Sequence, residues 1–191
     1  MTITAYKWSI DRYHQLIEMG LLDDALSQGL SQQSVELLQG EIIVMSPEGE
    51  SHAYYNTEVA EYLRELLGAR AKIRDAKPIT LPNDSEPVPD IAIVQPLGTI
   101  YLEHHPYPEN IFWLIEFANT TLKKDLGLKK EIYAAAGILE YWVVNLQATE
   151  LKVFRDLVDG TYCEKLTFTN GTIQPRSFPD KIVDIQRLLR A

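Results

Sequence analysis

Two short apolar runs in this chain each carry a carboxylate. Ile91 to Val94 begins directly after Asp90, and Phe112 to Phe117 holds Glu116 among five apolar residues. Runs of this length and composition are typical of strands buried on both faces of a sheet. A carboxylate is costly to bury there unless it is protonated, hydrogen-bonded or bound to a cation. If the strands are neighbours, Asp90 and Glu116 converge at one end of the sheet and predict a site for Mg²⁺ or Mn²⁺, which prefer hard oxygen ligands.

The elements that follow these runs indicate the fold class. Leucine, lysine and alanine dominate Leu122 to Ala136, which predicts a helix that Gly137 closes. Leu139 to Asn145 is a further apolar run and predicts the next buried strand. Strand, helix and strand in this order form a crossover connection if the two strands are parallel neighbours. We therefore expect an α/β chain of the α+β kind, with a mixed sheet flanked by helices.

The rest of the chain predicts elements around this unit. Before it, the pattern predicts a helix over Ile10 to Met19, a tight hairpin over Val35 to Met45 that turns at Gln39-Gly40, and a helix that Ser51 caps and Gly68 ends. An extended stretch over Ala71 to Leu81 and a loop over Gln95 to Asn110 are also expected. The last part predicts a β-meander over Leu151 to Phe154 and Tyr162 to Phe168 and a terminal helix over Val183 to Leu189. Since no linker or repeat interrupts the chain, we expect one domain over 1–191. Its core spans about 34–146, and the first helix and the meander are extensions of it.

Composition limits the class of function. The chain has 191 residues, 46% hydrophobic and 24% charged, and no apolar stretch approaches the roughly 20 residues of a membrane span. We expect a cytoplasmic protein without a membrane partner. Its one cysteine, Cys163, excludes an intramolecular disulfide and a thiolate zinc cluster, and we expect it to be buried.

The net charge of −9 works against general affinity for nucleic acid, because polyanion binding depends on Lys and Arg. Any nucleic-acid contact therefore needs local basic patches. Two candidate stretches contain Arg64, Arg70, Lys72, Arg74 and Lys77, and Lys123, Lys124, Lys129 and Lys130.

Three polar residues share one face of the helix over Leu122 to Ala136. Asp125, Lys129 and Tyr133 recur every four residues. A helix that follows the Glu116 strand can turn this face back toward the carboxylates. A lysine beside a metal-bound water would orient the water or stabilise charge on a phosphate.

Several stretches of the chain carry a family resemblance. They are Glu36-Leu-Leu-Gln-Gly-Glu41-Ile-Ile-Val-Met-Ser-Pro, His52 at the start of a helix, Val88-Pro89-Asp90-Ile-Ala-Ile-Val, Leu114-Ile-Glu116-Phe-Ala-Asn, and Asp125-x-x-x-Lys129-x-x-x-Tyr133-Ala-Ala-Ala-Gly137-Ile-Leu-Glu-Tyr141-Trp142-Val-Val-Asn145. These residues resemble the PD-(D/E)XK nuclease superfamily, and more closely its branch of bacterial restriction-endonuclease-like proteins of unknown function.

The resemblance implies a restriction-endonuclease-like core and a metal-dependent nuclease that cuts DNA. It implies Asp90 and Glu116 as ligands of Mg²⁺ or Mn²⁺, Lys129 as the catalytic lysine, and Glu41 as a further acidic member of the site. Many nucleases of this fold cut two strands, so a homodimer is also expected.

The chain departs from the superfamily pattern at one position. The lysine there lies two residues after the second acid, where this chain has Ala118. Residues 116 and 118 of a strand face the same side, so a lysine arriving from the helix can fill the volume beside Ala118.

Each candidate residue also has an alternative without a site role. Asp90 after a proline could order a turn, and Glu116 could pair with a buried lysine or arginine. Lys129 could be a solvated helix lysine, with Asp125 as its i,i+4 partner.

Other residues leave the same choice open. Glu41 could be exposed on an edge hairpin, and His52 could bond to backbone at a helix start. Tyr141 and Trp142 are expected in the core.

Three functions remain open from the sequence. The first is the metal-dependent nuclease. The second is a catalytically inactive module of the same fold for binding or assembly, which the acidic charge and the absent strand lysine favour. The third is a phosphohydrolase that acts on RNA or small nucleotides.

Overall fold

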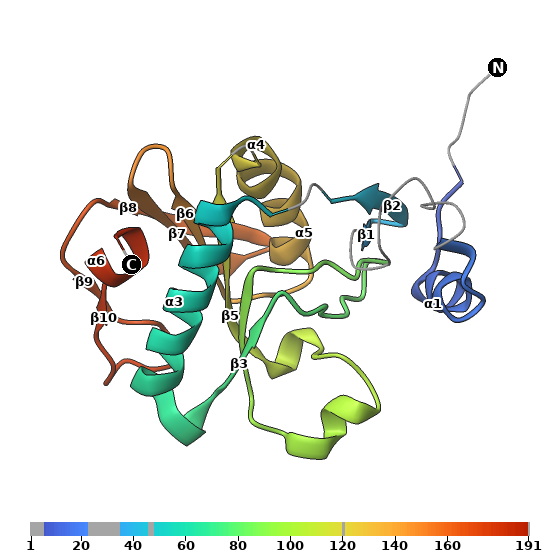
Figure 1. Ribbon diagram of the computed structural model, residues 1–191, viewed down its shortest axis with the longest axis horizontal. Helices are drawn as coiled ribbons and strands as arrows, with labels where there is room; N and C mark the ends of the chain where they lie inside the picture. Colours follow the sequence, from blue (N-terminus) through green and yellow to red (C-terminus); the bar gives the residue numbers. More distant parts are fainter. Residues whose placement is uncertain (1–5, 23–34, 46–47, 120, 191) are drawn as a thin grey trace.

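The computed structural model describes residues 6–22, 35–45, 48–119 and 121–190, and its centre is a six-stranded mixed sheet (Figure 1). The strands, in their order across the sheet, are β3 (Lys72–Asp75), β4 (Ile91–Val94), β5 (Ile111–Ala118), β6 (Glu140–Asn145), β7 (Glu150–Val158) and β8 (Thr161–Phe168). Only β5 and β6 pair in parallel within this sheet; the other neighbours are antiparallel. The predicted mixed sheet with flanking helices is confirmed.

Strand β5 has apolar neighbours on both faces. Trp113, Ile115 and Phe117 belong to the apolar cluster on one face, and Leu114 and Ala118 belong to the cluster on the other. Because side chains alternate along a strand, Glu116 faces the side of Leu114 and Ala118.

Helices cover both faces of the sheet. Helix α3 (Glu50–Leu67) and the short α6 (Gln186–Leu189) lie on one side, and the helical segment between β5 and β6 lies on the other (Figure 1). Helix α3 ends at Gly68, which has φ +55°, as the sequence predicts, and η2 (Gly68–Arg70) follows. Its N-cap is Gly49, so the prediction that Ser51 caps the helix is wrong: Ser51 lies inside the first turn.

The predicted helix over Leu122 to Ala136 is a run of three segments. They are α4 (Leu122–Lys124), the π-helical turn η5 (Asp125–Lys129) and α5 (Lys130–Ala135). A π-turn holds more residues per turn than an α-helix and often occurs at functional sites. Both end residues of η5 are buried.

The N-terminal elements form a smaller layer. Helix α1 (Ile10–Glu18) packs against a hairpin of β1 (Val35–Leu38) and β2 (Glu41–Val44). The hairpin turns at Gln39 and Gly40, with φ values of 50° and 76°. A Cβ on Gly40 would lie 2.9 Å from the Cβ of Lys7, so the close approach of the two segments requires glycine as well.

The segment after β6 joins the main sheet. The predicted meander is β7 and β8, which turn at Asp159-Gly160. The predicted helix over Val183 to Leu189 is wrong in its first half, because β10 (Val183–Asp184) pairs with β9 (Thr172–Ile173). The predicted loop over Gln95 to Asn110 contains two short helices, η3 (Gly98–Leu102) and η4 (Pro108–Asn110).

Cys163 corrects another expectation. It is exposed on β8, whereas its neighbour Tyr162 is buried. Strand alternation turns Tyr162 inward and Cys163 outward, so the expectation of a buried cysteine is wrong. In the part of the chain that the structure describes, no helix combines the length and the apolar character needed to cross a membrane.

Removing the Trp113 side chain is expected to destabilise the protein strongly. Its ring is fully buried and contacts the rings of Trp142 and Phe178. Trp113→Ala should lower the free energy of unfolding by about 3–5 kcal/mol. The control Leu139→Ala changes a largely exposed side chain and should stay within about 0.5 kcal/mol of wild type. Urea denaturation measures both, and equal losses would contradict the described core.

Candidate active site

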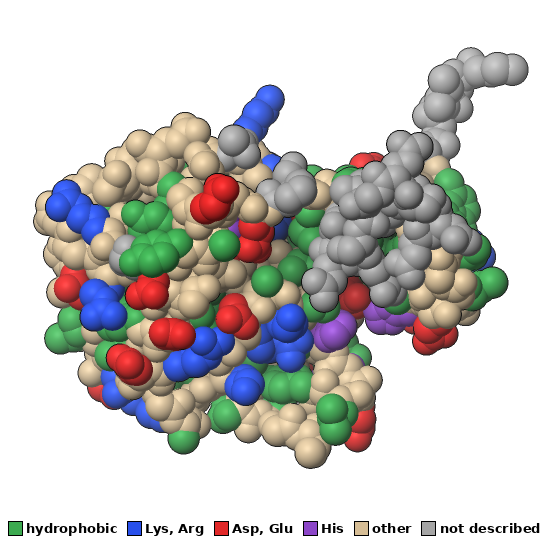
Figure 2. All heavy atoms as spheres, viewed as in Figure 1, with side chains coloured by type: hydrophobic (Ala, Val, Ile, Leu, Met, Phe, Trp, Pro, Cys, Tyr) green, Lys and Arg blue, Asp and Glu red, His purple; other side chains and the backbone are tan. Residues whose placement is uncertain are grey.

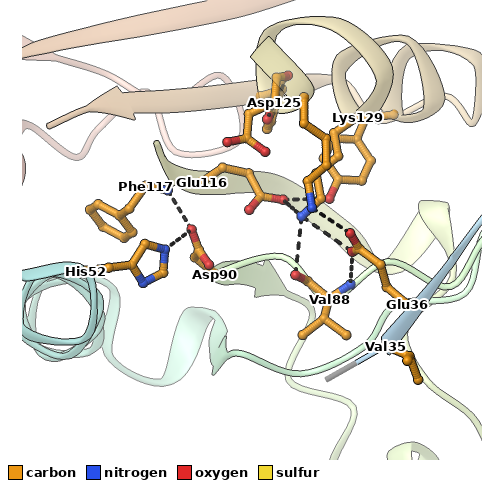
Figure 3. Close-up of polar contacts among 12 residues, drawn as sticks. Val35, Glu36, His52, Val88, Asp90, Glu116, Phe117, Asp125 and Lys129 are labelled. Atoms are coloured by element: carbon orange, nitrogen blue, oxygen red, sulfur yellow. Dashed lines mark hydrogen bonds and ion pairs between the residues drawn. The ribbon is translucent and has the colours of Figure 1, made fainter. Parts of the chain in front are cut away.

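Four carboxylates and a lysine converge beside one face of the sheet (Figure 3). Glu36 comes from β1, Asp90 directly precedes β4, Glu116 comes from β5, and Asp125 and Lys129 come from η5. In the antiparallel pair of β4 and β5, Ile91 lies opposite Ile115, so Asp90 and Glu116 are brought to the same place on adjacent strands. The predicted convergence of these two acids is confirmed.

Lys129 is buried among carboxylates. Its Nζ donates to Oε1 of Glu116 at 2.9 Å and lies 3.5 Å from Oε2 of Glu36, with only 4% of the side chain exposed. Burial lowers the pKa of Lys129, but the charges of the surrounding acids outweigh burial and raise it above its ordinary value. Lys129 is therefore a charged group inside the site and not a solvated helix lysine.

Glu36 is the ionised partner of two lysines. Its side chain is fully buried, its Oε1 accepts from Nζ of Lys124 at 2.9 Å, and its Oε2 accepts from the backbone N–H of Val88 at 3.2 Å. Burial raises the pKa of Glu36, but Lys129 and Lys124 outweigh this and lower it overall.

Glu116 has one oxygen bound by the protein. Its Oε1 accepts from Lys129 and, at 2.8 Å, from the hydroxyl of Tyr133, and no described residue donates to Oε2. Burial and the charges of Asp90 and Asp125 raise the pKa of Glu116 to about 8, against the opposing charge of Lys129. In the neutral form the proton belongs on Oε2, since Oε1 already accepts two hydrogen bonds.

Asp90 also presents one bound and one free oxygen. Its Oδ2 accepts from the backbone N–H of Phe117 at 2.6 Å and from Nε2 of His52 at 3.0 Å. Among the described residues Oδ1 has no hydrogen-bond donor. Asp90 therefore does more than order a turn: it ties β4 to β5 and to α3.

His52 bonds to a carboxylate rather than to backbone. Burial lowers the pKa of His52, but the hydrogen bond to Asp90 and the charges of Asp90 and Glu48 outweigh it and raise the pKa overall. The ring also meets Phe117 edge to face. His52, whose role the sequence leaves open, is thus bonded directly to Asp90, a candidate metal ligand.

Asp125 and Tyr133 complete the helix face that the sequence predicts. Both are buried, and burial raises the pKa of Asp125 although Lys129 opposes it. Lys129 forms its ion pairs with Glu36 and Glu116, so the i,i+4 pair with Asp125 is not the arrangement found.

The structure does not bring Glu41 to this site. Glu41 is exposed at the turn of the hairpin and pairs with Lys7. It lies opposite Leu38, two residues beyond Glu36 along the strand, which is about 7 Å. Glu36 is the acid of this hairpin that reaches the site. A sequence signal existed, since Val35, Leu37 and Leu38 enclose Glu36 as closely as apolar residues enclose Glu116.

The donor set fits a hard divalent cation. Asp90 and Glu116 each keep an oxygen free of donors from the described residues, on neighbouring strands. With all four carboxylates ionised, their charges exceed those of Lys124 and Lys129 by two, which a divalent cation would balance. Carboxylate oxygens are the ligands that Mg²⁺ prefers.

Comparisons with known proteins agree with this architecture. A profile of the Uma2 family, described as "Putative restriction endonuclease", matches residues 8–186. The chain belongs to the Uma2 family. No curated protein matches it.

A solved structure shares the fold of this Uma2 chain. It is described as a "putative nuclease belonging to DUF820" from Anabaena variabilis ATCC 29413, with 16% identity and a TM-score of 0.64. The match covers 88% of this chain and 96% of the other. The restriction-endonuclease-like fold implied by the sequence resemblance is confirmed.

Glu36 should matter more for stability than Glu41. Glu36→Ala leaves Lys124, the Val88 N–H and part of the Lys129 charge without a partner, and should cost about 3–5 kcal/mol of unfolding free energy. Glu41→Ala removes an exposed carboxylate and should stay within about 0.5 kcal/mol. Urea denaturation of the two variants would contradict the assignment if their losses were alike.

Stability without divalent cations should fall as pH rises from about 5 to 8. The pKa of Glu116 is about 8 in the folded protein and 4.5 ordinarily, so within this window the folded state holds a proton that the unfolded state has lost. Ionisation of Glu116 therefore removes up to about 1.4 kcal/mol per pH unit. Urea denaturation in EDTA should show this slope in wild type.

Two variants test the origin of that slope. Glu116→Gln should make the slope shallower, because glutamine does not titrate while Asp125 still does. Glu131→Gln, an exposed change on α5, should keep it. Equal slopes in wild type and Glu116→Gln would rule out Glu116 as its source.

Proposed function

We propose that this protein is a metal-dependent nuclease that hydrolyses phosphodiester bonds of DNA. The observation that carries the proposal is the pair of donor-free oxygens on Asp90 and Glu116, next to the buried ammonium of Lys129. The Uma2 description and the description of the similar solved structure support the same class of activity.

In this proposal Asp90 and Glu116 hold Mg²⁺ or Mn²⁺. The bound cation would lower the pKa of water and neutralise phosphate charge. Glu36 does not compete as a ligand, because both of its oxygens are already engaged by Lys124 and the Val88 N–H.

Lys129 contributes a fixed positive charge. When Glu116 binds the cation, Glu36 remains as the counter-ion of Lys129. Water adds to phosphorus, the P–O ester bond breaks, and the leaving oxygen takes a proton. Lys129 orients the water or stabilises the phosphate oxygens as negative charge develops on them.

Two hydrogen-bond donors, the Tyr133 hydroxyl and the Phe117 N–H, position the carboxylates in this scheme. The Tyr133 hydroxyl fixes Oε1 of Glu116, and the Phe117 N–H fixes Oδ2 of Asp90. Each carboxylate is thus held through one oxygen, and its other oxygen is available to bind the cation.

A chain of net charge −9 would have to bind a polyanion without a strongly basic surface. Arg64 pairs with Asp75 and Arg70 pairs with Asp180, so the first basic stretch is partly neutralised. Figure 2 shows both signs of charge interspersed on one face rather than a continuous basic surface. RNA and small nucleotides remain the alternative substrates, and a substrate panel separates them from DNA.

The homodimer also stays a prediction. Sedimentation of the purified protein at working concentration tests it, and a monomer there would reject it.

Cleavage of plasmid DNA should require a divalent cation and both acids. We expect cutting with Mg²⁺ or Mn²⁺, none in EDTA, and a loss of about 100-fold or more in rate for Asp90→Asn and for Glu116→Gln. Inactive wild type over DNA, RNA and nucleotide substrates would reject the proposal in favour of the non-catalytic module. Full activity in Asp90→Asn would reject the proposed site.

Lys129 and Lys130 form a matched pair for testing the lysine. Lys129→Met should lower kcat by about 100-fold or more, because it removes a buried charge next to the reacting phosphate. Lys130 lies over the ring of Phe154 on another side of the helix, so Lys130→Met should keep kcat within a few-fold of wild type. Steady-state cleavage assays measure both variants, and equal effects would contradict the assigned role.

A further inference from the structure

We infer that the edge of the main sheet at β3 binds one unpaired strand of DNA and leads it toward the candidate active site. The inference rests on the proposed function and deepens it, because it names the form of DNA that this site receives. The β3 surface consists of Lys72, Arg74, Lys77, His104 and Tyr107.

The face on which the charges of β3 lie is the first argument. Strand β3 is at one edge of the six-stranded sheet. Arg74 lies opposite Ala92 of β4, and Ala92 lies opposite Leu114 of β5. Leu114 shares its face with Glu116, because side chains alternate along a strand. Lys72 and Arg74 therefore stand on the face of the sheet that carries the candidate active site.

The cations of the β3 surface have no acid bound to them. Asp75, the acid of this strand, turns to the other face and pairs there with Arg64 of α3. Among the described residues, no carboxylate forms an ion pair with Lys72, Arg74 or Lys77. In a chain of net charge −9, these three charges are left to bind an anion from outside.

Arg74 is held in a fixed position for such an anion. Its Nη2 donates to the backbone oxygen of Pro78 at 3.3 Å, and its guanidinium lies 5.4 Å from the centre of the Tyr101 ring. The side chain is half-buried, and burial lowers the pKa of Arg74. A phosphate beside the guanidinium would offset the cost of this burial and accept from Nη1, to which no described residue bonds.

Two stacked rings extend the surface beyond β3. Their loop is tied to the segment after β3, because the N–H of Thr80 donates to the backbone oxygen of Pro106 at 3.0 Å. His104 and Tyr107 stack with their ring centres 4.2 Å apart, and Tyr107 is exposed. An unpaired base can stack on such a ring, whereas the bases of a duplex already stack on one another. The rings therefore favour a single strand over a duplex.

The β3 surface ends at the candidate active site. The N–H of Ala76, directly after β3, donates to the backbone oxygen of Asp90 at 2.8 Å. Figure 2 shows lysine, arginine and histidine side chains next to one another over the part of the molecule that Figure 1 labels β3. A strand whose phosphates follow Lys72 and Arg74 is therefore directed toward Asp90.

Fluorescence anisotropy of labelled DNA with the full chain in EDTA tests the inference, because EDTA lets binding be measured without metal-dependent cleavage. A single strand of about 16 nucleotides should bind about tenfold more tightly than a blunt duplex of the same length. The double variant Lys72→Gln/Lys77→Gln, with both changes exposed, should weaken single-strand binding about tenfold. It should also reduce the steepness of the log–log salt dependence by about 1.4.

Two matched pairs of variants test the ring and the arginine. Tyr107→Ala should weaken single-strand binding about fivefold or more, whereas Tyr54→Ala, which removes an exposed ring on α3, should not. Arg74→Gln should weaken it about threefold or more. Arg70→Gln makes the same change in net charge at an arginine paired with Asp180 and should stay within about twofold of wild type.

The inference is rejected if the duplex binds as tightly as the single strand, or if the lysine double variant and Tyr107→Ala bind like wild type. Thermal melts check folding, and the exposed lysine changes keep the test decisive if Arg74→Gln unfolds. Single-strand binding that depends on these residues, without cleavage in Mg²⁺, would reject the nuclease proposal alone. Cleavage that depends on Asp90 and Glu116 but not on the β3 surface would reject this inference alone.

Discussion

Lys129 is a charged amine with almost no access to water, and the site depends on how its charge is balanced. An isolated ammonium in such a place would lose its proton or destabilise the fold. Glu116 of the central sheet and Glu36 of the N-terminal hairpin stabilise the charged form of Lys129. The interaction therefore joins three elements that are distant in sequence. It also ties the electrostatics of the site to the folding of the chain.

The hairpin of β1 and β2 is consequently part of the site. Leu37 exchanges backbone hydrogen bonds with Glu86, which holds β1 beside the segment that leads to Val88 and Asp90. That contact sets the position of Glu36, which in turn accepts from the Val88 N–H. A change in how the hairpin docks would move the counter-ion of Lys129 and the segment that carries Asp90 at the same time.

Local patterns in the sequence account for most of the fold. The apolar runs of β4, β5 and β6 and the Gln39-Gly40 turn are visible in short windows, because burial and turn chemistry are local properties. The helix face of Asp125, Lys129 and Tyr133 also follows from spacing alone. A π-turn leaves no mark in a periodic pattern, so η5 was not expected.

The apolar neighbours of Glu36 indicate burial, but only the three-dimensional structure decides between Glu36 and Glu41 as the acid at the site. Both acids lie in one hairpin, and only the docking of β1 on the Glu86 segment decides which one is buried. A carboxylate among apolar residues is not by itself a sign of a site. Glu140 is fully buried too, yet it is bound by Nε1 of Trp142 and the backbone N–H of Arg176. What distinguishes Asp90 and Glu116 is an oxygen left free, and only the structure shows that.

The structure also shows how a lysine on the helix can reach Glu116 when the strand carries alanine at 118. Residue 118 faces the same side of β5 as Glu116, and there it is a buried alanine packed in the same cluster as Ile132 and Tyr133 of α5. A longer side chain at 118 would have to fit into this packed cluster, whereas alanine takes up little of its volume. Lys129 then reaches Oε1 of Glu116 from above the sheet, and Tyr133, one turn later, reaches the same oxygen. Alanine at 118 and lysine at 129 are thus compatible in one packing arrangement, in which the positive charge beside Glu116 comes from the helix.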